Sequence, residues 1–150
     1  MEMNENRVKL VSDYLAKLSL SEDIKGYFLG RKILVTGGAG AIGSNLVIAL
    51  SELVGDEGII IVLDNLSAIK GSVPIDFPSL PNIMFVNGDV RNDVDLKRVF
   101  RERPTIIYHL AAFFANQNSV DYPEISADID INGMIKLLDL AQFTDVERFI

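Results

Sequence analysis

The glycine-rich segment Thr36–Ser44 constrains the fold more than any other part of this 150-residue chain. It reads Thr-Gly-Gly-Ala-Gly-Ala-Ile-Gly-Ser, and it lies between the apolar run Ile33–Val35 and a stretch in which apolar residues recur every three or four positions. A short apolar run that leads into glycines is typical of a buried parallel strand. The segment therefore predicts a strand, a tight turn and a helix, in that order.

Strand and helix patterns continue to alternate along the chain. Further strands are expected at Ile59–Leu63, at Ile83–Val86, at Ile106–Leu110 and from Arg148, and further helices after Asn92 and from Pro123. Because no tight hairpin signal separates the strands, this order predicts βαβ units and a parallel sheet with helices on both faces. The predicted fold is α/β, a Rossmann-type doubly wound sheet over residues 31–150 that is truncated at the start of its fifth strand. Ile42, Val94 and Met134 are among the residues expected on buried helix faces.

Residues 1–30 precede the first strand and are predicted to form a helical N-terminal extension. Apolar residues at three- and four-residue spacing over residues 5–18 predict an amphipathic helix. Ser19 followed by Glu22 is a capping-box pattern for a second, short helix that ends near Gly30. Such an extension either packs on its own domain, which is the favoured interpretation, or serves as an arm for docking or dimerisation.

Composition and charge exclude several classes of protein. The net charge of −7, without any Lys/Arg cluster, argues against a nucleic-acid surface. Apolar runs such as Ile59–Leu63 are far shorter than the roughly 20 residues of a membrane helix, and the N-terminus lacks the pattern of a secretory signal. The absence of Cys rules out thiolate metal sites and fits the cytoplasm. No metal site is predicted, since the acidic stretch from Asp121 to Asp130 is interpreted as a solvated helix start.

The glycine spacing itself matches a turn that binds a dinucleotide. A diphosphate binds at a helix N-terminus, where free N–H groups and the helix dipole favour negative charge. Gly37, Gly40 and Gly43 follow the pattern G-x-x-G-x-x-G. We expect Gly37 to make the tight turn, Gly40 to admit the diphosphate and Gly43 to let the helix approach the strand. A P-loop is excluded because no Gly-Lys-Ser/Thr follows the glycines.

An acidic residue follows the second predicted strand at the expected distance. Asp64 comes 21 residues after Gly43, close to the roughly 20 that separate the glycines from the ribose-binding carboxylate. A carboxylate there accepts hydrogen bonds from the ribose hydroxyls and repels a 2′-phosphate, so NAD is favoured over NADP. The alternative, a structural turn with a solvated Asp, does not explain why strand, glycines, helix and acid occur together.

Four motifs in this order resemble the extended short-chain dehydrogenase/reductase family. They are Thr36–Gly43, Asp64–Ser67, Gly88–Arg91 and His109–Ala112. Within that family the chain is most similar to the NAD-dependent nucleotide-sugar epimerases and dehydratases, such as UDP-glucose 4-epimerase. The resemblance covers about residues 31–150, which correspond to the N-terminal half of a usual family member.

The resemblance implies cofactor contacts at several strand ends. It places Asp64 and Asn65 at the adenosine ribose, with Ser67 nearby. Asp89 would hydrogen-bond the adenine amino group, although it could instead cap a turn. The segment from Phe113 to Val120 would pass beside the nicotinamide and approach the sugar, although Phe113 and Phe114 could be ordinary core residues. His109 is interpreted as a core histidine. The full set of predicted cofactor-binding residues is Gly37, Gly40, Ala41, Ile42, Gly43, Asp64, Asn65, Ser67, Asp89, Val90, Leu110, Ala111 and Ala112.

The implied activity is oxidation of a sugar C4 hydroxyl by hydride transfer to NAD, followed by epimerisation, dehydration or decarboxylation. Family catalysis uses a Tyr-x-x-x-Lys pair, in which the cation lowers the tyrosine pKa. None of the four tyrosines has Lys four residues later. No catalytic residue is therefore assigned; the pair and the substrate lobe are expected beyond Ile150, and these 150 residues alone are expected to be inactive.

Two further features bear on this interpretation. The family often shows Asn-Val-x-Gly-Thr in the long helix, whereas this chain has Asp130 and Met134 at the first and last of these positions. The departure puts in doubt the polar support that this helix gives the active site, and it leaves open a non-catalytic NAD(P)-binding sensor module. An NADP-linked reductase or lyase conflicts with Asp64. The resemblance also implies a nucleotide-sugar substrate and a homodimer.

Overall fold

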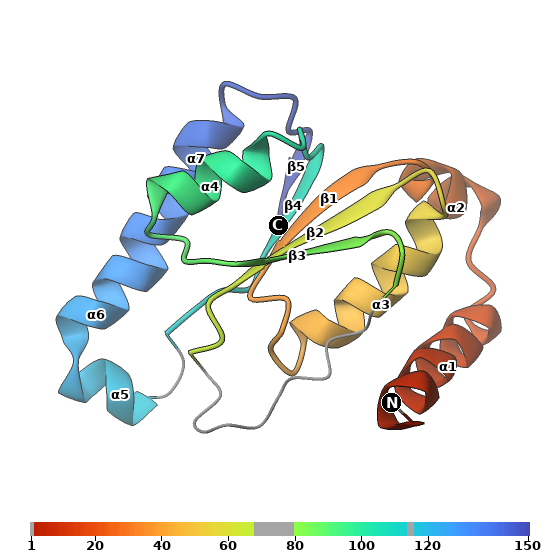
Figure 1. Ribbon diagram of the computed structural model, residues 1–150, viewed down its shortest axis with the longest axis horizontal. Helices are drawn as coiled ribbons and strands as arrows, with labels where there is room; N and C mark the ends of the chain where they lie inside the picture. Colours follow the sequence, from red (N-terminus) through yellow and green to blue (C-terminus); the bar gives the residue numbers. More distant parts are fainter. Residues whose placement is uncertain (1, 68–79, 114–115) are drawn as a thin grey trace.

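The computed structural model describes residues 2–67, 80–113 and 116–150 (Figure 1). Its five strands form one sheet in the order β3-β2-β1-β4-β5, and every strand pair is parallel. The strands are β1 (Lys32–Thr36), β2 (Ile59–Asp64), β3 (Ile83–Asn87), β4 (Ile106–His109) and β5 (Arg148–Phe149). This strand order is that of a doubly wound nucleotide-binding sheet, so the predicted Rossmann-type fold is confirmed.

Helices cover both faces of the sheet. Figure 1 shows α3 on one face and α4 and α7 on the other. The helices are α1 (Glu2–Lys17), α2 (Glu22–Phe28), α3 (Gly43–Val54), α4 (Asp93–Phe100), α5 (Asn116–Asp121), α6 (Pro123–Ala127), a π-helical turn η1 (Asp128–Asn132) and α7 (Gly133–Ala141). Within the described ranges, none of them is long and apolar enough to cross a membrane.

The core consists of two clusters, one on each face of the sheet. Successive side chains of a strand point to opposite faces. Leu34 of β1 accordingly packs in the cluster under α4 and α7, whereas Ile33 and Val35 pack in the cluster under α3. All three side chains are fully buried. A central parallel strand must therefore be apolar at every position, which explains the continuous apolar run in the sequence.

Some residues that were expected on buried helix faces are exposed. Ile42 is 75% exposed, Val94 74% and Met134 38%, whereas Leu137 of α7 is fully buried. Ile42 precedes α3 and Val94 lies in the first turn of α4. Both helices begin at the carboxyl edge of the sheet, where a helix extends past the strands that it covers. Periodicity thus predicts the buried stripe of a helix but not where along the helix the burial begins.

The N-terminal extension packs against α3. Nε of Arg7 in α1 donates to Oδ1 of Asn45 over 3.0 Å, and Nη2 of Arg7 donates to Oγ of Ser44. Tyr27 and Phe28 of α2 pack beside the core cluster under α3. Both helices of the extension therefore contact the same helix of the sheet domain.

The N-cap of α2 is Ser21, whose Oγ accepts a hydrogen bond from the backbone N–H of Ile24. The prediction of a capping box that begins at Ser19 was therefore wrong by two residues. Ser19 has a φ of +47°, whereas an N-cap residue has an extended backbone. Two serines only two positions apart made the pattern ambiguous, and the left-handed backbone of Ser19 excludes it as the N-cap.

Candidate dinucleotide-binding site

A cavity of about 450 Å³ opens at the carboxyl edge of the sheet. Strand order reverses at β1, which has β2 on one side and β4 on the other, and open α/β sheets bind ligands at such a point. All thirteen residues that were predicted to bind the cofactor line this cavity: Gly37, Gly40, Ala41, Ile42, Gly43, Asp64, Asn65, Ser67, Asp89, Val90, Leu110, Ala111 and Ala112. The lining residues that sequence reasoning missed are Ala39, Leu63, Leu66, Gly88 and Ile129.

The glycine turn brings the main chain close to β4 and to the start of α3. Gly37 has a φ of +68°, and a Cβ there would lie 2.6 Å from the backbone N of Ala111. A Cβ on Gly43 would overlap the carbonyl oxygen of Gly37. Around Gly40, by contrast, the nearest atom to an added Cβ is that same oxygen, at 3.3 Å. Gly37 and Gly43 are thus required by packing, whereas Gly40 borders open space.

The carboxylate of Asp64 is held beside the glycine turn. Its Oδ2 accepts a hydrogen bond from the N–H of Ala39 over 2.9 Å, and its Oδ1 accepts one from the N–H of Leu66 over 2.8 Å. The second bond accompanies a φ of +60° at Leu66, which is uncommon for a residue with a side chain. Each carboxylate oxygen keeps a further lone pair. Asp64 can therefore accept two more hydrogen bonds at the cavity wall.

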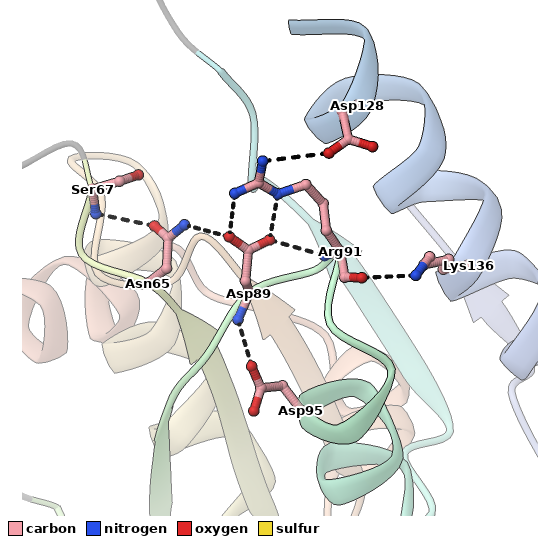
Figure 2. A network of polar contacts seen from close by, with 7 residues as sticks. All are labelled: Asn65, Ser67, Asp89, Arg91, Asp95, Asp128 and Lys136. Atoms are coloured by element: carbon pink, nitrogen blue, oxygen red, sulfur yellow. Dashed lines mark hydrogen bonds and ion pairs between the residues drawn. The ribbon is translucent and has the colours of Figure 1, made fainter. Parts of the chain in front are cut away.

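The carboxylate of Asp89 accepts four hydrogen bonds from the protein (Figure 2). Its Oδ1 accepts from the backbone N and from Nε of Arg91, over 2.9 and 3.0 Å, and its Oδ2 accepts from Nη2 of Arg91 over 2.8 Å. The fourth donor is Nδ2 of Asn65, at 3.0 Å. The hydrogen bonds from the Arg91 side chain lower the pKa of Asp89 to about 2. Asp89 is therefore ionised at neutral pH, and the four acceptor positions of a carboxylate are filled.

Arg91 also joins the end of β3 to the helices on the same face. Its Nη1 lies 3.4 Å from Oδ2 of Asp128, and its carbonyl oxygen accepts a hydrogen bond from Nζ of Lys136 over 2.7 Å (Figure 2). A Cβ on Gly133 would lie 2.8 Å from Cγ2 of Val90, so this glycine lets α7 approach the cavity wall. Asp128, which belongs to the acidic stretch from Asp121 to Asp130, thus has a structural role as a partner of Arg91. Across the described residues, no cluster of three or more His, Asp or Glu could hold a metal ion.

Asp130, in place of the usual family Asn, supports the chain that leaves β4. Its Oδ1 accepts from the N–H of Phe113 over 2.8 Å, and its Oδ2 accepts from Oγ of Ser126 over 3.0 Å. Asp130 thus gives this segment a polar contact in place of the usual Asn, since the backbone N–H needs only an acceptor. Asp130 lies in the π-helical turn η1, which interrupts the helix expected from Pro123. Short π-turns are frequent at functional sites. Phe114 lies outside the described residues.

His109 has a hydrogen-bond partner, as the sequence suggested, but it is half-buried at the end of β4 rather than inside either core cluster. Its Nδ1 lies 2.7 Å from Oγ1 of Thr36, which also accepts a hydrogen bond from the N–H of Ala111. Burial lowers the pKa of His109, and burial raises the pKa of its neighbour Tyr108. A tyrosine that acts as a base near neutral pH needs a lowered pKa. Tyr108 is therefore not prepared to act as such a base.

Comparison with known proteins adds independent evidence. Residues 34–150 match the model of a family described as GDP-mannose 4,6 dehydratase. The structure of an epimerase from Methanothermobacter thermautotrophicus is 47% identical with a TM-score of 0.76, over 85% of this chain and 36% of that one. The UDP-glucose 4-epimerase of Thermus thermophilus, solved as a complex with NAD, is 33% identical with a TM-score of 0.66, over 79% of this chain and 36% of that one.

Among curated proteins, CDP-paratose 2-epimerase of Salmonella typhi is 38% identical over 111 residues, which are 72% of this chain and 32% of that protein. The chain spans about a third of the length of the first curated relatives that it matches. The family match covers most of the chain, and it includes the glycine turn and all the strand ends that line the cavity. The chain therefore belongs to the GDP-mannose 4,6 dehydratase family, the nucleotide-sugar epimerases and dehydratases of the extended short-chain dehydrogenase/reductase type.

Proposed function

We propose that this chain is the NAD-binding portion of an enzyme that oxidises the C4 hydroxyl of a nucleotide sugar. The observation that carries the proposal is the cavity in which the open glycine turn at the start of α3 faces the carboxylate of Asp64. The relatives support it, because the Thermus enzyme was solved with NAD and a UDP-glucose 4-epimerase of Thermotoga maritima with UDP-glucose. NAD, when bound, would supply the acceptor for the sugar's hydride.

The residues of the cavity fit this cofactor at the diphosphate and at the ribose. The open space at Gly40 borders the N-terminus of α3, where free N–H groups and the helix dipole favour an anion. The two remaining acceptor positions of Asp64 suit the two hydroxyls of the adenosine ribose. A 2′-phosphate would bring its charge against the same carboxylate. The cavity is therefore expected to prefer NAD over NADP.

At the adenine end the proposal requires one exchange of partners. The adenine amino group can reach an acceptor on Asp89 only if one of its four donors leaves. Asn65 is the neutral side-chain donor and holds only one of the four bonds, so it is the one that adenine would replace. Its amide would then be free to hydrogen-bond the ribose, the role that the family resemblance implies for Asn65.

We assign no catalytic residue within residues 1–150. A nucleotide sugar as the substrate, a homodimeric assembly and a cytoplasmic location are further parts of the proposal. Their support comes from the family and from the composition rather than from contacts in the cavity.

Calorimetric titration of the chain with NAD and NADP tests the proposal. We expect NAD to bind more tightly by about tenfold or more, because about 1.4 kcal/mol of charge repulsion corresponds to that factor. Asp64→Asn should weaken NAD binding and remove most of the preference. Asp56→Asn removes an exposed carboxylate outside the cavity and should change neither value. Equal affinity for the two cofactors, or no binding of either, would contradict the proposal.

A further inference from the structure

We propose that Arg7 of the N-terminal extension is a positioning residue for the diphosphate of the dinucleotide, an inference that rests on the proposed function. The family match begins at residue 34, so Arg7 belongs to a part of the chain that the family model does not describe. Its guanidinium nonetheless lies on the first turn of α3, where it donates to the side chains of Ser44 and Asn45. This turn is the one that would receive the diphosphate.

A chain of hydrogen bonds leads from Arg7 to the glycine turn. Ser44 is only 4% exposed, and its Oγ donates to the carbonyl oxygen of Gly40 over 2.6 Å while it accepts from Nη2 of Arg7. The N–H of Gly40 in turn donates to the carbonyl oxygen of Gly37 over 3.2 Å. Arg7 thus fixes, through one buried hydroxyl, the main chain that borders the open space of the cavity.

The positive charge of Arg7 is unfavourable at the N-terminus of α3 unless an anion binds nearby. A cation near a helix N-terminus opposes the helix dipole, and the first turn of α3 contains no acidic residue that would compensate. Among the side chains that the structure describes, Arg7 forms no ion pair with a carboxylate. The two side chains to which it donates in the described part of the chain are both neutral. A bound diphosphate would turn this unfavourable charge into a favourable one.

A diphosphate in the cavity needs a positive charge near it, because the charged groups of the cavity wall are carboxylates. The cavity lining contains the carboxylates of Asp64 and Asp89, and none of its lining residues in the described part of the chain is Lys or Arg. Asp89 is compensated by Arg91, whereas the donors to Asp64 among the described residues are all neutral N–H groups. A dinucleotide diphosphate carries negative charge and would meet this uncompensated carboxylate. Arg7 offsets the repulsion from behind the turn, without entering the cavity.

The test compares ligands that contain the diphosphate with one that lacks it. NAD, ADP and adenosine are titrated into the wild-type chain and into Arg7→Gln, which keeps an N–H donor but removes the charge. We expect NAD and ADP to bind about two- to fivefold more weakly to Arg7→Gln, the factor that matches one charge at a helix end. Adenosine affinity should not change. Lys9→Gln removes the same charge from an exposed position of the same helix and serves as the matched control, and Arg7→Lys should bind NAD nearly as tightly as the wild type.

Salt provides a second readout, because an effect of charge shrinks at high ionic strength. The difference between wild type and Arg7→Gln should largely disappear in about 1 M NaCl, where the Debye length falls to about 3 Å. Unchanged NAD affinity in Arg7→Gln, an equal loss of adenosine affinity, or an equal loss in Lys9→Gln would each overturn the inference while leaving the proposed function intact. If the wild-type chain binds none of the three ligands, the proposed function fails and the inference fails with it.

Discussion

The same substitution at two glycines of one turn is expected to affect two different properties: stability at Gly37 and cofactor binding at Gly40. Gly37→Ala places a methyl group 2.6 Å from the backbone N of Ala111 and 2.7 Å from the carbonyl carbon of Leu110. A φ of +68° costs a residue with a Cβ about 1–2 kcal/mol, and overpacking against main chain costs typically about 1–3 kcal/mol more. We therefore expect Gly37→Ala to lower the free energy of unfolding by about 2–5 kcal/mol.

Gly40→Ala should leave stability almost unchanged and impair binding instead. The nearest atom to its new methyl group is the carbonyl oxygen of Gly37, at 3.3 Å, which requires an adjustment of only a few tenths of an ångström. We expect the free energy of unfolding to change by less than about 1 kcal/mol. The methyl group would nevertheless occupy the space that the diphosphate needs. NAD affinity should fall by about tenfold or more, equivalent to about 1.4 kcal/mol.

Urea denaturation followed by circular dichroism gives the free energies of unfolding, and calorimetry gives the affinities. Gly26→Ala is the matched control, because Gly26 lies in α2 with nothing within 4 Å of an added Cβ. Replacing a glycine inside a helix by alanine should stabilise the protein by roughly 0.5–1 kcal/mol. A Gly37→Ala variant as stable as the wild type would refute the packing argument. A Gly40→Ala variant with full NAD affinity would refute the placement of the diphosphate.

Three further outcomes test individual contacts. The folded-state pKa of Asp89, about 2, lies below the ordinary value of 3.8, so its ion pair with Arg91 contributes stability above a pH of about 4 that is lost as the pH falls through about 2. Asp89→Asn should flatten that decline, as measured by thermal unfolding across this pH range. Asp130→Ala leaves the N–H of Phe113 without its acceptor and should cost about 1–3 kcal/mol in urea denaturation; Asp130→Asn, which keeps a carbonyl oxygen, should restore most of it. Ser21→Ala should lower stability by about 1 kcal/mol through loss of the N-cap, and Ser19→Ala by much less.

The sheet and the position of the cavity could be predicted from the sequence because both depend on local patterns. Each parallel strand is apolar throughout, and the carboxyl ends of parallel strands meet at one edge. Gly37 comes directly after β1 and Asp64 ends the neighbouring β2, so the strand assignment alone brings them together. The spacing between them then identifies the ligand class.

The polar contacts that hold the site could not be predicted in the same way. Arg91 is an ordinary charged residue in the sequence, and its partner Asp128 comes from a helix 37 residues later. The π-helical turn around Asp130 also has no signature in a pattern based on 3.6 residues per turn. Arg7 contacts Ser44 only because α1 packs along α3. In each case the contact depends on how two elements are placed, which local periodicity does not encode.

The central place of β1 in the sheet also determines when the cavity can be assembled during synthesis. The chain must extend 25 residues beyond Ala39 before the carboxylate of Asp64 can reach the turn, and Thr36 meets His109 only 73 residues later. Parallel pairings over such separations form slowly. In the nascent polypeptide, β1 therefore has at least one unpaired edge until its second neighbour, β4, has been translated. The wall of the cavity at β4 is among the last parts to form.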